Sequence, residues 1–197
     1  SESRTEGSYC LTPTVVAHPD AFSYKECSGE EIGSILDGNK ISKYFNTHLT
    51  NEPLWLTDNL VFLGEIERTN DFENIDPIGQ CEHIDSMLDD YVKDDSALVY
   101  KSPQGLVIIT GCSHAGICNI IEYAKKVCGE DRVLDVIGGF HLLEPTKAQS
   151  EGTLHYFEEQ NINNIHPCHC TSLEYKIKLS KSADVKDVGV GLSLVYP

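Results

Sequence analysis

Three stretches in the second half of the chain share one hydrophobic pattern. Each is a run of apolar and β-branched residues, typical of a buried strand, followed within a few positions by a histidine. The predicted strands and their histidines are 106–110 with His114, 133–138 with His141, and 162–166 with His169. Loops at the carboxyl ends of strands commonly bind ligands in α/β proteins, because the strand holds a loop that stays exposed.

The rest of the pattern predicts more strands and a few helices. Strands are expected at 13–18, 97–101 and 185–195, with a hairpin inside 54–66. Helices are expected after the capping boxes 28–31 and 171–174, from Gly116 to Gly129, and for roughly 12 residues from Lys147. Mostly strands with several helices between them indicate an α/β (α+β) protein with a mixed sheet.

The chain organisation predicted from this pattern is one domain over residues 1–197. Residues 1–11 are expected to be a flexible tail. Residues 70–95 are acidic and weakly patterned, so we predict a surface insertion there, either a solvated loop or a cover over a cleft.

The charge excludes several kinds of partner. A formal charge of −16, with only 15 scattered basic residues, argues against binding to nucleic acid or an anionic membrane. No apolar run approaches the roughly 20 residues that span a bilayer. Eight cysteines without a C-x-x-C pair are predicted to be mainly reduced small hydrophobes. We therefore expect a cytoplasmic protein.

The three histidines are candidate metal ligands. Imidazoles gathered at one sheet edge suit zinc, or iron or manganese, and three unrelated core histidines would be a less economical explanation. The alternative is that they hydrogen-bond to backbone carbonyls or cap helices. His18 is expected to be structural, while His48 and His83 are expected to be exposed.

Four motifs carry a resemblance to a known family. They are Asp94-Asp-Ser-Ala-Leu-Val, Thr110-Gly-Cys-Ser-His-Ala-Gly-Ile, Ile137-Gly-Gly-Phe-His-Leu and Pro167-Cys-His-Cys-Thr. Together they resemble an archaeal and bacterial branch of the metallo-β-lactamase superfamily. Members of this branch are commonly labelled as the dihydropterin-ribofuranosylaminobenzene-phosphate synthase of tetrahydromethanopterin biosynthesis.

The resemblance implies an αββα sandwich, of which this sequence holds mainly the C-terminal portion. The superfamily signature His-x-His-x-Asp-His does not occur in these 197 residues, as if roughly the first quarter were truncated, encoded separately or degenerate. The absence of this signature implies that the chain holds one metal ion at most. It also implies a homodimer, or a complex with a chain that supplies the missing half. Sequence alone does not choose between an enzyme and an inactive or partner-binding remnant.

Site residues follow from the resemblance and the motif positions. The expected metal ligands are His114, His169 and His141, with Cys112 as a further candidate, and no residue is assigned a catalytic role. Residues expected to line a substrate pocket are Ser113, Asn119, Phe140 and Thr171. The implied substrate is a phosphorylated or pterin-like small molecule, and the alternative is hydrolysis of phosphoesters or esters.

Overall fold

The main sheet has seven strands in the order β13-β12-β11-β10-β9-β6-β5, in the computed structural model of residues 12–160 and 162–197. In chain order they are β5 (Leu54–Trp55), β6 (Leu60–Phe62), β9 (Ala97–Ser102), β10 (Gly105–Thr110), β11 (Val133–Gly139), β12 (Asn164–Cys168) and β13 (Asp184–Val185). The strands from β10 to β13 are parallel, whereas β5, β6, β9 and β10 pair antiparallel. The mixed sheet, the hairpin within 54–66 and the three central strands confirm the predictions.

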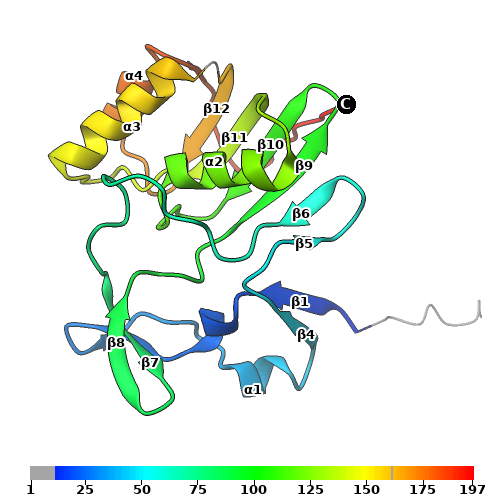
Figure 1. Ribbon diagram of the computed structural model, residues 1–197, viewed down its shortest axis with the longest axis vertical. Helices are drawn as coiled ribbons and strands as arrows, with labels where there is room; N and C mark the ends of the chain where they lie inside the picture. The colour runs from blue at the N-terminus through cyan, green and yellow to red at the C-terminus, as the bar shows by residue number, and fades with distance from the viewer. Residues whose placement is uncertain (1–11, 161) are drawn as a thin grey trace, which may run out of the picture.

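Helices α2 (Ile117–Cys128), α3 (Lys147–Glu159) and α4 (Leu173–Leu179) lie beside the main sheet in the upper part of Figure 1. Strand alternation explains the packing. Leu106 and Ile108 of β10 are fully buried in the same core as α2, while Val107 and Ile109 point to the opposite face. Helix α2 ends at Gly129 in the left-handed conformation, φ 58°, as the sequence predicts.

Two smaller sheets and a short helix fill the lower part of Figure 1. Their elements are β1 (Thr14–Ala17) parallel to β4 (Asn46–Leu49), the antiparallel set β3 (Glu30–Glu31), β2 (Lys25–Cys27), β7 (Gly79–His83) and β8 (Ser86–Asp90), and α1 (Gly38–Ile41). A 3-10 turn covers Pro19–Phe22. Of the lone histidines, His18 is buried, and His48 and His83 are exposed as expected.

The helix predicted after residues 28–31 is wrong. Ser28 and Gly29 have φ values of 54° and 82°, and they form the two-residue connection between β2 and β3. Positive φ at both positions is what a tight hairpin turn requires, so the Ser-Gly pair is a turn signal rather than a helix start.

The insertion at 70–95 is also more regular than expected, because β7 and β8 form a five-pair hairpin within it. Most positions of this hairpin are exposed, so its sequence lacks the alternation of apolar and polar residues that indicates a strand. The prediction of a flexible tail at 1–11 lies outside the described residues. In the described chain, no helix combines the length and apolarity needed to cross a membrane.

The strand predicted at 185–195 is wrong beyond its first residue. Pairing stops at Val185, and the following segment lies over the sheet face opposite the helices without joining a ladder. Val188, Leu192 and Leu194 of this segment face Val107 and other apolar side chains across a cavity of about 710 Å³. The alternation of apolar residues in this segment predicts a strand with Val190 on the same face, but Val190 is fully exposed. A strand also needs a hydrogen-bonding neighbour, which this segment lacks among the described residues.

The helix after the capping box at 171–174 is confirmed as α4, with a different cap. Ser172, not Thr171, is its N-cap. Leu179 is fully buried, but Leu173 and Ile177 are 73% and 58% exposed. Of these three aliphatic residues, only Leu179 therefore joins the core.

Candidate functional site

The loops that follow β10, β11 and β12 meet at one edge of the main sheet. A cavity of about 400 Å³ lies between them, and the residues that line it are Cys112, His114, His141, Leu143, Glu144, Gln149, His169 and Cys170. Parallel strands present their carboxyl ends at the same edge, so three separate motifs reach one cavity. The predicted convergence of the three histidine loops is confirmed.

His114 presents an unsatisfied nitrogen beside this cavity. Its Nδ1 atom is buried and has no hydrogen-bond partner among the described residues. Burial lowers the pKa of His114, and the nearby His141 lowers it further. The imidazole is therefore held neutral near pH 7, which is the form that ligates metals.

His141 lies against His114, with ring centroids 4.4 Å apart and ring planes inclined by 50°. Burial lowers the pKa of His141 as well. Its backbone is held on both sides, since the N–H donates to Cys170 Sγ at 3.3 Å and the carbonyl accepts from Gln149 Nε2 at 3.1 Å. Two neutral imidazoles thus share the cavity wall.

His169 is the exposed member of the set. It lines the same cavity, but in the described chain its ring does not stack on His114 or His141. Within the described ranges, no group of three or more His, Cys, Asp or Glu side chains is arranged to hold a metal ion. The donor set fits a metal in part: two imidazoles are together, one has an orphaned buried nitrogen, and the third histidine is nearby.

Backbone strain marks the same three loops. Ser113, His141 and His169 have φ values of 59°, 52° and 49°, in the left-handed region that residues with a Cβ seldom occupy. Each such residue costs roughly 1–3 kcal/mol and persists where surrounding contacts impose it, often at functional sites. His169 lies outside the strand, because β12 ends at Cys168.

The four residues expected to contact substrate are buried and do not line the cavity as the described residues define it. Ser113 Oγ donates to the Gly139 carbonyl at 2.5 Å, and Thr171 Oγ1 accepts from Phe140 N–H at 3.0 Å. The Phe140 ring stacks on Phe157 with centroids 5.9 Å apart. These contacts tie the three loops together, and contact with substrate stays a prediction.

Asn119 and Glu73 form hydrogen bonds that fix the amino end of α2. Asn119 Oδ1 accepts from the backbone N–H of Thr69 at 2.8 Å and of Asn70 at 3.2 Å. Glu73 accepts from the N–H groups of Cys118 at 3.1 Å and Asn119 at 3.0 Å, although burial raises its pKa. The helix N-terminus is consequently occupied by a carboxylate and is closed to an anionic ligand.

Gly116 explains why Glu73 can reach those amides. Its φ is 98°, and a Cβ on it would lie 2.2 Å from Glu73 Oε2. The helix begins without a side-chain cap of its own, so a residue 45 positions away in sequence supplies one. Glu73 lies in the acidic stretch for which the sequence predicted a surface insertion, either a solvated loop or a cover over a cleft.

Asp95 is a site residue that the sequence analysis named only as part of a motif. Its carboxylate accepts from the Ala115 N–H at 2.9 Å and so fixes the loop that carries His114. Burial raises the pKa of Asp95 to about 6 despite that bond. Glu144 and Gln149 were also missed, and both extend the wall into an adjoining 230 Å³ cavity that reaches Asp76.

We compared the chain with known protein families and solved structures. No family model matches the chain. The crystal structure of Tm1679, a metal-dependent hydrolase of the β-lactamase superfamily, superposes with a TM-score of 0.82 at 27% identity, over 95% of this chain and 73% of that one. The chain therefore has a metallo-β-lactamase-like fold.

Two proteins of Methanocaldococcus jannaschii are similar in sequence. The 7,8-dihydropterin-6-methyl-4-(β-D-ribofuranosyl)-aminobenzene-5'-phosphate synthase is 32% identical over 130 residues, which are 64% of this chain and 44% of that protein. The uncharacterized protein MJ0448 is 32% identical over 171 residues, 85% of this chain and 62% of that protein. The chain therefore spans less than two thirds of either curated relative.

Proposed function

We propose that this chain is a metal-dependent enzyme of the metallo-β-lactamase fold, or part of one, in which His114, His141 and His169 hold one metal ion. The observation that carries the proposal is the buried, unpartnered Nδ1 of His114 beside the neutral His141 ring. A buried polar atom without a partner costs about 1–3 kcal/mol. A ligated ion removes that cost.

The ligand assignment has two parts. His114 and His141 are already together at 4.4 Å between centroids, so they supply the first two donors. His169 is assigned the third because it lines the same cavity. Imidazole donors suit zinc first, and iron or manganese next.

The proposed reaction is transfer or hydrolysis at a phosphorylated, pterin-like or ester substrate. When bound, the ion would polarise a substrate oxygen or activate water. The chain's own residues provide the binding surface: the Glu144 carboxylate and Gln149 amide line both adjoining cavities beside the histidines. We favour a synthase-like activity because 64% of the chain aligns with the synthase.

Hydrolysis of phosphoesters or esters is the second candidate. It is favoured by the 0.82 TM-score to Tm1679, which is described as a metal-dependent hydrolase. The two candidates share the same cavity and differ in whether water or a second substrate attacks. Assaying purified protein with aryl phosphoesters, aryl esters and pterin alcohols separates them.

Zinc titration tests the metal proposal. The double variant His114→Ala, His169→Ala should lose zinc affinity by more than about 100-fold, since loss of even an outer partner of a ligand costs 10–100-fold. His155→Ala is the matched control, because His155 is 69% exposed on α3 and pairs with Glu159. Equal affinity in wild type and double variant would retire the metal hypothesis.

Metal content tests the stoichiometry. Since three histidines line the cavity, we expect one ion or less per chain in freshly purified protein, measured by mass spectrometry of the native protein and by elemental analysis. Two tightly held ions per chain would contradict the ligand count.

We further propose that the chain forms a homodimer through the sheet face opposite the helices. Ile109 on that face is 42% exposed, and Leu192 of the covering segment is 45% exposed. Sedimentation velocity should show a dimer at micromolar concentration and a monomer for Ile109→Asp. Ile84→Asp is the control, since Ile84 is 98% exposed on the β7–β8 turn. A wild-type monomer, or assembly only with a different chain, contradicts the homodimer.

A further inference from the structure

Two cysteines line the histidine cavity, and the thiol of one contacts the backbone of the other. Cys112 follows β10 and Cys170 follows β12, and both line the cavity although they are 58 positions apart in sequence. Both are free thiols in this structure. Neither is among the described cysteines buried in α2, namely Cys118 and Cys128.

Gly139 brings the two cysteines together. A Cβ on Gly139 would lie 2.5 Å from Cys170 Sγ and 3.2 Å from Cys112 Cα, so both residues pack against the same side of one glycine. The Cys170 thiol also donates to the Cys112 carbonyl at 3.2 Å. The absence of a side chain at Gly139 is what leaves room for this approach.

The two thiols differ in accessibility. Cys170 is only 8% exposed. Cys112 is half-buried and borders the open cavity. An oxidant entering the cavity therefore meets Cys112 first, and Cys170 is positioned to react second.

We propose that Cys112 and Cys170 are a redox-modification site that closes into a disulfide across the cavity wall. This bond would join the loop that carries His114 to the loop that carries His169. The site needs neither metal nor substrate, so it stands independently of the proposed enzymatic function.

The chemistry uses a small-molecule disulfide, such as oxidised glutathione, as the oxidant. The Cys112 thiolate attacks one glutathione sulfur, forming a mixed disulfide and releasing one glutathione thiolate. Cys170 then loses its proton and attacks Cys112 Sγ, releasing the second glutathione thiolate. Two protein thiols are oxidised, one glutathione disulfide is reduced to two thiols, and the protein loses two hydrogen atoms.

The test is peptide mapping of the whole chain. Fully reduced protein, kept with a metal chelator throughout, is equilibrated with set ratios of oxidised to reduced glutathione and then trapped by acid and alkylation. We expect a peptide pair linked between Cys112 and Cys170, with a mass lower by two hydrogens, that a dithiol reductant reverses. Cys168→Ser is the matched control, because Cys168 lies at the end of β12, two residues before Cys170. This variant should keep the link, since Cys168 is not part of the proposed disulfide.

Single variants report the order of events. Cys170→Ser should stop at a glutathione adduct on Cys112, and Cys112→Ser should leave Cys170 largely unmodified because it is buried. The proposal is overturned if wild-type protein accumulates only glutathione adducts, or if Cys170 or Cys112 links to Cys168 instead. These outcomes are all measured on the wild-type protein, so the proposal can be tested even if a variant fails to fold.

Discussion

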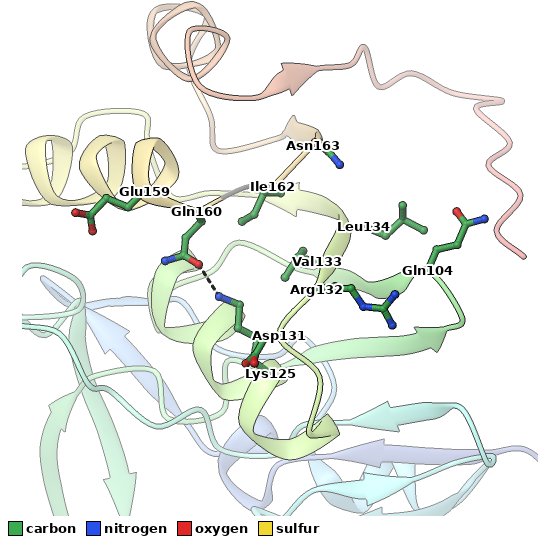
Figure 2. Close-up of a pocket in the computed structure, with 10 residues that line it drawn as sticks. All are labelled: Gln104, Lys125, Asp131, Arg132, Val133, Leu134, Glu159, Gln160, Ile162 and Asn163. Carbon is green, nitrogen blue, oxygen red and sulfur yellow. Dashed lines mark hydrogen bonds between the residues drawn. The ribbon is translucent and has the colours of Figure 1, made fainter.

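Two cavities of similar size lie at opposite edges of the main sheet. The histidine cavity, of about 400 Å³, is at the carboxyl ends of the parallel strands. The other, of about 380 Å³, is at their amino ends and is shown in Figure 2. Because the two cavities have similar volumes, only the chemistry of their lining residues can indicate which of them binds a ligand.

The two basic side chains of the amino-end cavity, Lys125 and Arg132, are already paired. Lys125 binds Glu122 and Gln160, both at 2.8 Å, and the second of these bonds is drawn in Figure 2. Arg132 is paired with Glu130 at 2.7 Å. The carboxyl-end cavity instead combines an orphaned histidine nitrogen with three strained loops. Unsatisfied groups and strain, rather than empty space, indicate where a ligand belongs.

The largest expected effect comes from removing the packing beneath the carboxyl-end loops. Phe140 is 1% exposed and stacks on Phe157. Phe140→Ala should lower the free energy of unfolding by about 3–5 kcal/mol. Gln104→Ala at the other edge is exposed and should stay within about 0.5 kcal/mol. Denaturant unfolding measures both, and equal losses would mean that the two edges are equally supported.

A smaller loss is expected for Asn119→Ala, which leaves the N–H groups of Thr69 and Asn70 without their acceptor. We expect a loss of about 1–3 kcal/mol of unfolding free energy. Asn163→Ala, exposed at the amino-end cavity, is the control. A stable Asn119→Ala protein with impaired substrate binding would instead return Asn119 to the pocket-lining role predicted from the sequence.

The pH dependence of stability should have opposite sign at the two edges. Burial raises the pKa of Asp95 to about 6 from an ordinary 3.8, so the folded state binds more protons there, and stability from this group rises as pH falls from about 6 to 3.8. The hydrogen bonds from Arg132 lower the pKa of Glu130 from 4.5 to about 2, so its contribution is lost as pH falls through that range.

Two isosteric variants check those signs in chelated protein. Asp95→Asn should remove the gain between pH 6 and 4, a difference of at most about 3 kcal/mol. Glu130→Gln should reduce the loss of stability below pH 4.5 only slightly, because the partner Arg132 is 62% exposed to solvent. Unfolding curves recorded along the pH series that show the same slope for wild type and Asp95→Asn would contradict the burial of that carboxyl.

Prediction from sequence succeeded where one strong local pattern decided the outcome. The run Leu106–Thr110 contains five apolar or β-branched residues, and it forms a central strand in which Leu106, Val107 and Ile108 are buried. Prediction failed where the same local residues are compatible with two different structures. Ser28–Glu31 satisfies a capping box, but Gly29 at φ 82° turns the chain into a hairpin.

The candidate site divides in the same way. Sequence placed His114, His141 and His169 after successive strands, and the sheet brings them to one cavity. It did not show that Asn119 faces Thr69 rather than a pocket, because that contact joins residues 50 positions apart. Thr171 likewise bonds to Phe140 and leaves the α4 cap to Ser172.

By itself, the sequence determined that each histidine motif follows a strand and that helices lie between these motifs, because periodicity and capping act over a few residues. Only the tertiary structure decided which side chains are unsatisfied. His114 Nδ1 is orphaned, Glu73 closes the start of α2, and Cys112 lies beside Cys170, each through contacts between distant segments. Burial and pairing depend on what the rest of the chain packs against, and no local pattern carries that information.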